Sequence, residues 1–166
     1  MENQTQKETL LDPKWNSIFY IGQIASYGFV LITVLAMIIF VIWPYTPGES
    51  DIEIIFIELQ TNRFEALMSL DLMWLIIEPF VIFVIIATYF AVKKENESWA
   101  IIALIIGMMG CILIYTARPI AELIYLSDQY ANATTVAEKQ HYLTAGESLI
   151  AIFNGTAWMM SNFLIS

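Results

Sequence analysis

The sequence predicts an all-α protein, a polytopic bundle of about four transmembrane helices with a short interfacial helix in the first outer loop. Apolar residues make up 58% of the 166 residues, and charged residues only 14%, whereas about a quarter of a soluble domain is charged. Most of the charged residues lie in an N-terminal segment and in short connecting stretches. The apolar stretches between them are long enough to cross a hydrocarbon core as helices, which satisfy all their backbone polar groups internally.

This pattern divides the chain into a polar N-terminal segment, residues 1–17, and a transmembrane helical bundle, residues 18–166. Four long apolar or periodic segments form the predicted helices of the bundle, at about 18–43, 64–92, 98–117 and 136–166.

Residues at the segment ends set these boundaries. Pro44 and Pro47 end the first helix, because proline cannot continue a helix. Residues 51–59 mix acidic with apolar side chains and are too short to span a bilayer, so we expect a short helix along the interface. Thr135 and Glu138 have the spacing of a capping box, which predicts that the fourth helix begins near Val136. Residues 118–134 are interpreted as a second, longer connection.

Composition also excludes several classes of function. The net charge of −9 argues against a nucleic-acid partner, which would require clustered basic residues. Cys111 is the single cysteine and His141 the single histidine, so we expect neither an intrachain disulfide nor a zinc site, and no cofactor. No nucleophile elbow, P-loop or dinucleotide-binding turn occurs in the sequence, and we therefore expect no enzymatic activity.

Ionisable residues inside apolar segments are the best candidates for a functional site, because each costs about 2.5–3.5 kcal/mol at the centre of a membrane helix. Asp71 and Glu78 are two helical turns apart on one predicted face, with Glu78 near the membrane midplane. Arg118 ends the third helix at the level of Asp71, which predicts an ion pair between them. Glu147 is expected at a similar depth, and Asn154 on the same face near Glu78.

Several interpretations of this polar cluster remain open. It is either a structural network that fixes helix register, or a proton or cation relay or small polar ligand site through Glu78 and Asp71. If the cluster is a structural network, the chain is an integral membrane protein without a defined biochemical activity. If it is a relay or a ligand site, the chain is a transporter or ion-coupled permease subunit that uses Glu78. A further alternative is an assembly, sensor or regulatory subunit that binds another membrane protein through the third and fourth helices, or a homo-oligomer.

The distribution of basic residues predicts the orientation in the membrane. Lys93 and Lys94 lie in a short turn, which favours a cytoplasmic position for that turn. The N-terminal segment, with Lys7 and Lys14, is then also cytoplasmic, and both longer connections face outward.

Several stretches in order resemble an uncharacterised family of bacterial multi-pass membrane proteins labelled domain of unknown function 4386. They are residues 42–47, 70–72, 126–134, 145–147 and 155–157. The resemblance implies a helical bundle in the bacterial cytoplasmic membrane and no particular activity. Such proteins continue through about two further helices after the position that matches Ser166, which leads us to expect that this chain is part of a larger bundle.

Overall fold

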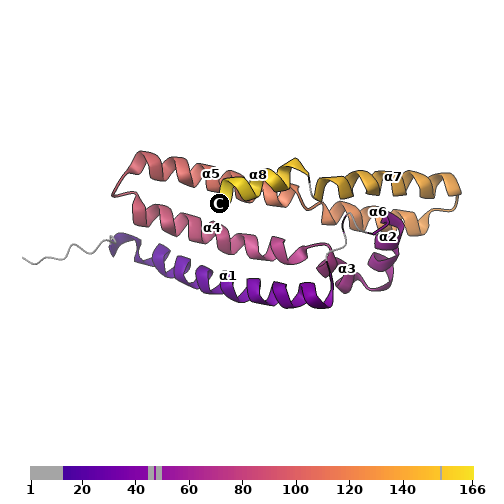
Figure 1. Cartoon of the computed structure of the whole chain (residues 1–166), viewed down its shortest axis with the longest axis horizontal. Coiled ribbons are helices and arrows are strands. Elements are labelled where there is room, and N and C mark those ends of the chain that lie inside the picture. The colour runs from indigo at the N-terminus through magenta and orange to yellow at the C-terminus, as the bar shows by residue number, and fades with distance from the viewer. Residues whose placement is uncertain (1–12, 45–46, 48–49, 154) are drawn as a thin grey trace, which may run out of the picture.

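The computed structural model describes residues 13–44, 47, 50–153 and 155–166. The described residues form helices and contain no β-strand (Figure 1). The elements in chain order are η1 (Pro13–Trp15), α1 (Asn16–Ile42), α2 (Ile52–Thr61), α3 (Arg63–Ser69), α4 (Leu72–Val92), α5 (Glu97–Thr116), α6 (Ile120–Asn132), α7 (Val136–Phe153) and α8 (Thr156–Ile165).

Four stretches of helix are long and apolar enough to cross a membrane, and this confirms the predicted fold class. They are Pro13–Ile42, Leu72–Val92, Glu97–Asn132 and Val136–Ile165. The bounds of α1 and α5 agree with the predicted first and third helices to within two residues. The Asn96 side chain begins α5 by accepting a hydrogen bond from the Trp99 backbone N–H at 3.2 Å.

The prediction of a single second helix over residues 64–92 is wrong, because the structure has two helices there. Asp71 has a φ angle of 70°, and this left-handed residue separates α3 from α4. Aspartate tolerates that conformation better than most residues because its short side chain is polar. The membrane-spanning part therefore begins at Leu72, and α3 is a separate short helix beside it.

The fourth predicted helix begins where expected but is interrupted. Thr135 Oγ1 accepts a hydrogen bond from the Glu138 N–H at 3.2 Å, and Glu138 Oε2 accepts one from the Thr135 N–H at 3.1 Å. This reciprocal pair is a capping box, and α7 begins at Val136 as predicted. The helix ends at Phe153, and α8 follows from Thr156 after Gly155, whose backbone is extended.

Four helices, α2, α3, α6 and α7, form what we call the cap, at one end of the molecule (Figure 1). The expected short helix is α2, and its buried apolar residues, among them Phe56 and Leu59, pack against α6 and α7. The predicted connection 118–134 contains α6, a helix that we did not expect. Helices α2 and α6 meet in a core that buries Phe56, Leu59 and Leu123 completely. The cap thus has an apolar core like that of a soluble helical domain.

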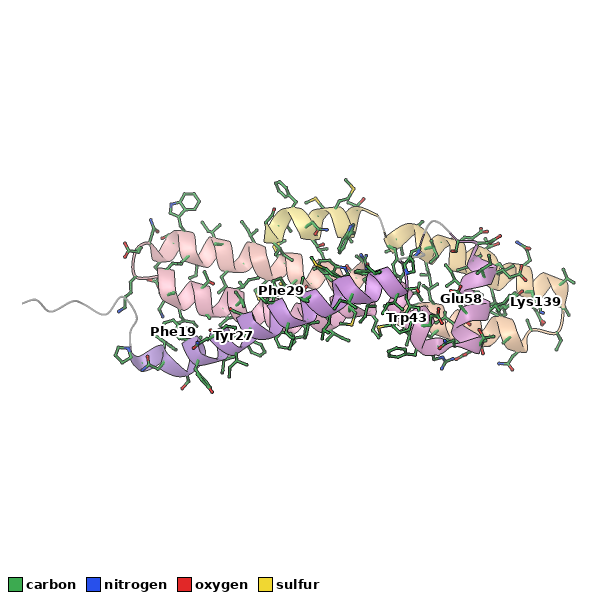
Figure 2. The ribbon with its side chains drawn as sticks, turned by 60° about the horizontal axis from the view of Figure 1, so that its bottom comes forward. Phe19, Tyr27, Phe29, Trp43, Glu58 and Lys139 are labelled. Atoms are coloured by element: carbon green, nitrogen blue, oxygen red, sulfur yellow. The ribbon has the colours of Figure 1, made fainter. Side chains whose placement is uncertain are left out.

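The remaining helices form what we call the membrane row, in which α1 lies beside α4, α4 beside α5, and α5 beside α8 (Figure 1). Gly22 brings α1 into close contact with Ala87 of α4, and Gly110 of α5 faces Ile165 of α8. Most outward-facing side chains of the row are apolar, such as Val41, which is 83% exposed. In Figure 2, Trp43 marks the junction of α1 with the cap, where its ring packs edge-on against Phe64 at 5.6 Å.

Candidate functional site

The best candidate for a functional site is a buried arginine at the junction between the cap and the membrane row. Arg118 lies in the break between α5 and α6, next to Pro119. Proline lacks an N–H donor and restricts the residue before it, so the chain cannot continue α5 through this point. The break turns the Arg118 side chain into the protein, where the residue is only 3% exposed.

Arg118 pairs with Asp71, which lies in the break between α3 and α4. Both Nε and Nη2 of the guanidinium donate to Asp71 Oδ2, at 3.1 and 2.8 Å. Asp71 is 4% exposed, so both charges are almost completely removed from solvent. The predicted ion pair between these two residues is confirmed.

A third helix break completes the site. The Nη1 group of Arg118 donates to the Phe153 carbonyl at 2.7 Å and to the Ala117 carbonyl at 3.0 Å. Phe153 is the last residue of α7, and Ala117 follows the end of α5. Carbonyl groups at a helix end have no partner within the helix and require one from elsewhere. One guanidinium therefore satisfies acceptors at the α3–α4, α5–α6 and α7–α8 breaks together, and we call this group the three-break clamp.

Aromatic rings cover the clamp. The Arg118 guanidinium carbon lies 4.0 Å from the centre of the Trp158 ring and 5.4 Å from that of Phe153. Trp74, on the first turn of α4, packs edge-on against Trp158 at 5.6 Å. A guanidinium is attracted to the face of an aromatic ring, and this attraction strengthens when water is excluded.

Glu78 is buried separately from the clamp. It is 1% exposed, and its Oε1 atom has no hydrogen-bond partner among the described residues. Cys111 of α5 is buried and faces its carboxyl group closely enough to interact with it. Since α4 begins at Leu72, Glu78 lies about 9 Å along the helix axis from its start. The break at Asp71 moves the start of this helix from the predicted residue 64 to Leu72, and the expectation that Glu78 lies near the midplane stays a prediction.

The two other predicted site residues are not brought into this group. Glu147 is exposed on α7 and is not a hydrogen-bond partner of Arg118. Residue 147 lies nearly two turns before the α7–α8 break, on a surface of the cap. Asn154 lies outside the described residues.

Sequence reasoning missed a second polar group, which holds the cap together. The Ser127 hydroxyl of α6 is fully buried and donates to the Phe56 carbonyl of α2 at 2.9 Å. Gln60 donates to Ser127 and to Asp128, both at 2.8 Å, and Arg63 pairs with Asp128 at 2.7 Å. The Arg63–Asp128 pair is exposed, so its contribution to stability is small.

Comparison with known proteins found no matching family model, no matching curated protein and no matching solved structure. By length and composition, four stretches of helix in the described part of the chain could cross a membrane, and buried polar residues lie at the places described above.

Proposed function

We propose that this chain is a non-enzymatic subunit of a membrane assembly, in which it binds another membrane protein or a second copy of itself. One observation carries the proposal, namely that the membrane row is open. Because α1 and α8 are its two ends, each has a flank without a neighbouring membrane helix in the described row. Large apolar side chains cover these flanks, among them Leu31 of α1 and Phe163 of α8. Contiguous apolar surfaces at membrane depth accept either lipid or another helix.

The chemistry of the three-break clamp supports a structural role for it. Its guanidinium hydrogen-bonds a carboxylate and two backbone carbonyls, and rings of Phe153 and Trp158 lie over it. A charge in such a position holds helices in place and has little capacity left for a substrate. The clamp then fixes the cap on the membrane row, so that the cap is presented to a partner in a defined position.

The arrangement of charges supports the orientation that we propose. Lys14, Lys93 and Lys94 lie at the end of the membrane row away from the cap, whereas acidic side chains outnumber basic ones on the cap. Basic residues favour the cytoplasmic side. We therefore place the N-terminus and the α4–α5 turn in the cytoplasm and the cap outside, in a bacterial cytoplasmic membrane as the family resemblance implies.

Site-specific photo-crosslinking in native membranes tests the subunit proposal. On a Cys111→Ala background, single cysteines replace the exposed residues Leu31 of α1, Phe163 of α8 and Phe83 of α4 and carry a benzophenone probe. We expect a discrete protein adduct from Leu31 or Phe163, and lipid adducts alone from Phe83, which is the control. The absence of any protein adduct from both Leu31 and Phe163 would contradict the proposal.

A second candidate function is a proton or cation relay in a transporter subunit, with Glu78 as the relay group. It is supported by the Oε1 atom of Glu78, which is buried without a hydrogen-bond partner among the described residues. A carboxyl group in that position has an unfilled capacity to bind a proton or a cation. Proton and cation flux into proteoliposomes, compared between the wild type and Glu78→Gln, tests it. Equal flux in the two proteins would remove Glu78 from any transport mechanism.

A further inference from the structure

We infer that η1 and the end of α4 together bind the phosphate group of an anionic phospholipid. The site consists of five residues, which we call the basic-aromatic cluster: Lys14, Trp15, Tyr89, Phe90 and Lys93. It lies at the end of the membrane row away from the cap (Figure 1). The inference does not depend on a protein partner, because the cluster lies where α1 already packs against α4.

Two lysines share one aromatic ring in this cluster. The Lys93 ammonium group lies 4.3 Å from the centre of the Trp15 ring, and the Lys14 ammonium group lies 5.1 Å from it. The two positive charges are therefore less than about 10 Å apart, which is within the range over which charges interact at physiological ionic strength. They repel each other, and an anion bound by both reduces this repulsion.

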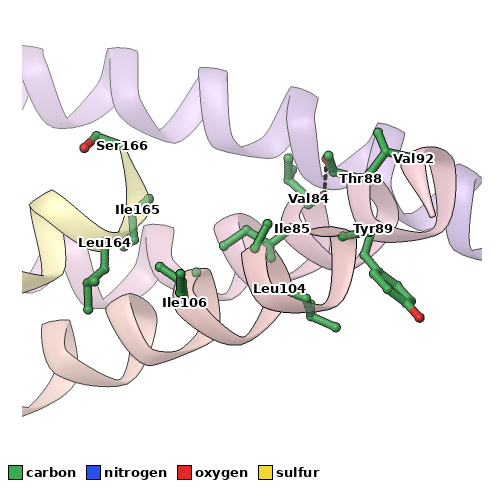
Figure 3. A pocket seen from close by; sticks show the side chains of 13 residues that line it. Val84, Ile85, Thr88, Tyr89, Val92, Leu104, Ile106, Leu164, Ile165 and Ser166 are labelled. Carbon is green, nitrogen blue, oxygen red and sulfur yellow. Dashed lines mark hydrogen bonds between the residues drawn. The ribbon is translucent and has the colours of Figure 1, made fainter. Parts of the chain in front are cut away.

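Aromatic rings hold Lys93 in a defined position. Its ammonium group lies 4.2 Å from the centre of the Phe90 ring and 5.6 Å from that of Tyr89. The Trp15 ring packs on Phe90 at 4.1 Å, and Phe90 packs edge-on against Tyr89 at 5.0 Å. Figure 3 shows Tyr89 beside Val92 on the last turns of α4. Because a cation is attracted to the faces of such rings, Lys93 is positioned between η1 and α4.

The polar groups of the cluster are donors for which the described part of the chain supplies no acceptor. Lys93 forms no ion pair there, although Glu95 and Glu97 follow it closely in the sequence. The Trp15 indole N–H and the Tyr89 hydroxyl likewise have no hydrogen-bond partner among the described residues. An ammonium group offers three N–H donors and no acceptor. The ligand that matches this set is an anion with several oxygen atoms, and a phosphate group has that chemistry.

The depth of the cluster assigns the phosphate to a lipid. Lys93 directly follows the apolar stretch Leu72–Val92, and Lys14 lies in the first turn of the stretch Pro13–Ile42. Helices that span a bilayer over these stretches place both lysines at the headgroup level of one leaflet, where tryptophan and tyrosine rings are also favoured. Basic groups at that level attract anionic lipids. The apolar sides of α1 and α4 continue from the cluster into the membrane, where the acyl chains lie.

Native mass spectrometry of the purified chain in detergent tests the inference, with equal amounts of phosphatidylglycerol and phosphatidylcholine supplied. We expect Lys93 to raise the ratio of bound phosphatidylglycerol to bound phosphatidylcholine about fivefold, the factor that one basic residue near an anionic headgroup contributes. Lys93→Gln should therefore lower this ratio about fivefold, and Lys93→Arg should keep it. Equal occupancy by the two lipids in the wild type would overturn the inference, as would an unchanged ratio in Lys93→Gln.

Lys94→Gln is the matched control, because it removes the same charge from the same turn. Lys94 is exposed and lies over no ring of the described residues, and one residue corresponds to about 100° around a helix axis. We expect its loss to lower the lipid ratio by less than about twofold, since salt screens an exposed charge. Equal losses in Lys93→Gln and Lys94→Gln would show that diffuse positive charge attracts the lipid, and would overturn a defined site.

Two further arms test the shared ring and the source of the phosphate. Trp15→Leu keeps an apolar side chain but removes the ring that positions both lysines, so it should also lower the lipid ratio. An unchanged ratio in this variant would contradict the role of the ring. Glycerophosphoglycerol, the same headgroup without acyl chains, should not displace phosphatidylglycerol at equal concentration. Displacement would assign the site to a water-soluble phosphate compound and would overturn the assignment to a lipid.

Discussion

Arg118 shows how a single side chain can be stable at the edge of an apolar region. A guanidinium has five N–H donors in a fixed plane, so it can serve several acceptors that lie in different directions. Here it donates to Asp71, Ala117 and Phe153, which come from three helix breaks. Lysine could not replace it, because a lysine ammonium is a point charge on a flexible stem.

Asp71→Asn and Arg118→Gln test the coupling within the clamp. Asparagine tolerates the left-handed backbone of residue 71, so Asp71→Asn removes charge without adding backbone strain. We expect each single variant to lose about 3–5 kcal/mol of stability, since removing one partner leaves a buried charge uncompensated. The midpoint of thermal unfolding in detergent measures this loss.

The double variant separates coupling from independent effects. If the two residues interact, the loss in the double variant is smaller than the sum of the single losses. Strict additivity would show that the pair contributes no interaction energy. The exposed pair is the control, and Arg63→Gln should cost about 1 kcal/mol or less.

Glu78 differs from the clamp because a buried oxygen of its carboxyl group has no hydrogen-bond partner among the described residues. Such an atom loses its hydration without compensation, at a cost of about 1–3 kcal/mol. We expect Glu78→Leu to stabilise the protein by about 1–3 kcal/mol, which thermal unfolding in detergent would show as a higher midpoint. A lower midpoint would mean that the carboxyl group makes a stabilising contact, with Cys111 as the neighbour to examine by Cys111→Ala.

At the scale of elements, the contact of α1 with α4 depends on small residues. A side chain added at Gly22 would overlap Ala87 of α4, so the two helices approach as closely as their backbones allow. Close approach through small residues increases van der Waals contact, the main attraction between helices in lipid.

Gly22→Val tests this close approach. We expect it to destabilise the protein by about 1–3 kcal/mol, because the added methyl groups force α1 away from α4. Ser26→Val places the same valine side chain one turn later, on the exposed side of α1, and should cost about 1 kcal/mol or less. Thermal unfolding in detergent measures the loss of stability in each variant. Equal losses of stability in the two variants would contradict the packing argument.

At the scale of the whole molecule, the chain has two parts with different surroundings. The cap buries a core of Phe56, Leu59, Leu123 and Phe153, whereas the membrane row exposes apolar side chains on its outside. The three-break clamp lies where the two parts meet. A cap positioned in this way is consistent with the binding role that we propose.

The proposed orientation can be measured by cysteine labelling in intact cells. On a Cys111→Ala background, Tyr125→Cys on the cap should react with a membrane-impermeant maleimide, since Tyr125 is 62% exposed. Lys94→Cys, in the α4–α5 turn, should react only after the membrane is permeabilised. The reverse pattern would show that the cap is cytoplasmic.

Sequence determined the all-α class, the four stretches of helix that could cross a membrane, the ends of α1 and α5, and the start of α7. These features follow from long apolar stretches, prolines and a capping box, all of which act over a few neighbouring residues. The ion pair of Asp71 with Arg118 could also be predicted, because the helix lengths place both residues at the same depth.

Only the tertiary structure showed where two predicted helices break and which hydrogen bonds stabilise these breaks. Asp71 lies between α3 and α4, and Phe153 ends α7, at positions where Arg118 supplies hydrogen bonds from elsewhere in the chain. The α6 helix was missed for a related reason, because its apolar face is completed only by α2. Local sequence fixes which residues can form a helix, but the partners that make an interruption stable come from segments far along the chain.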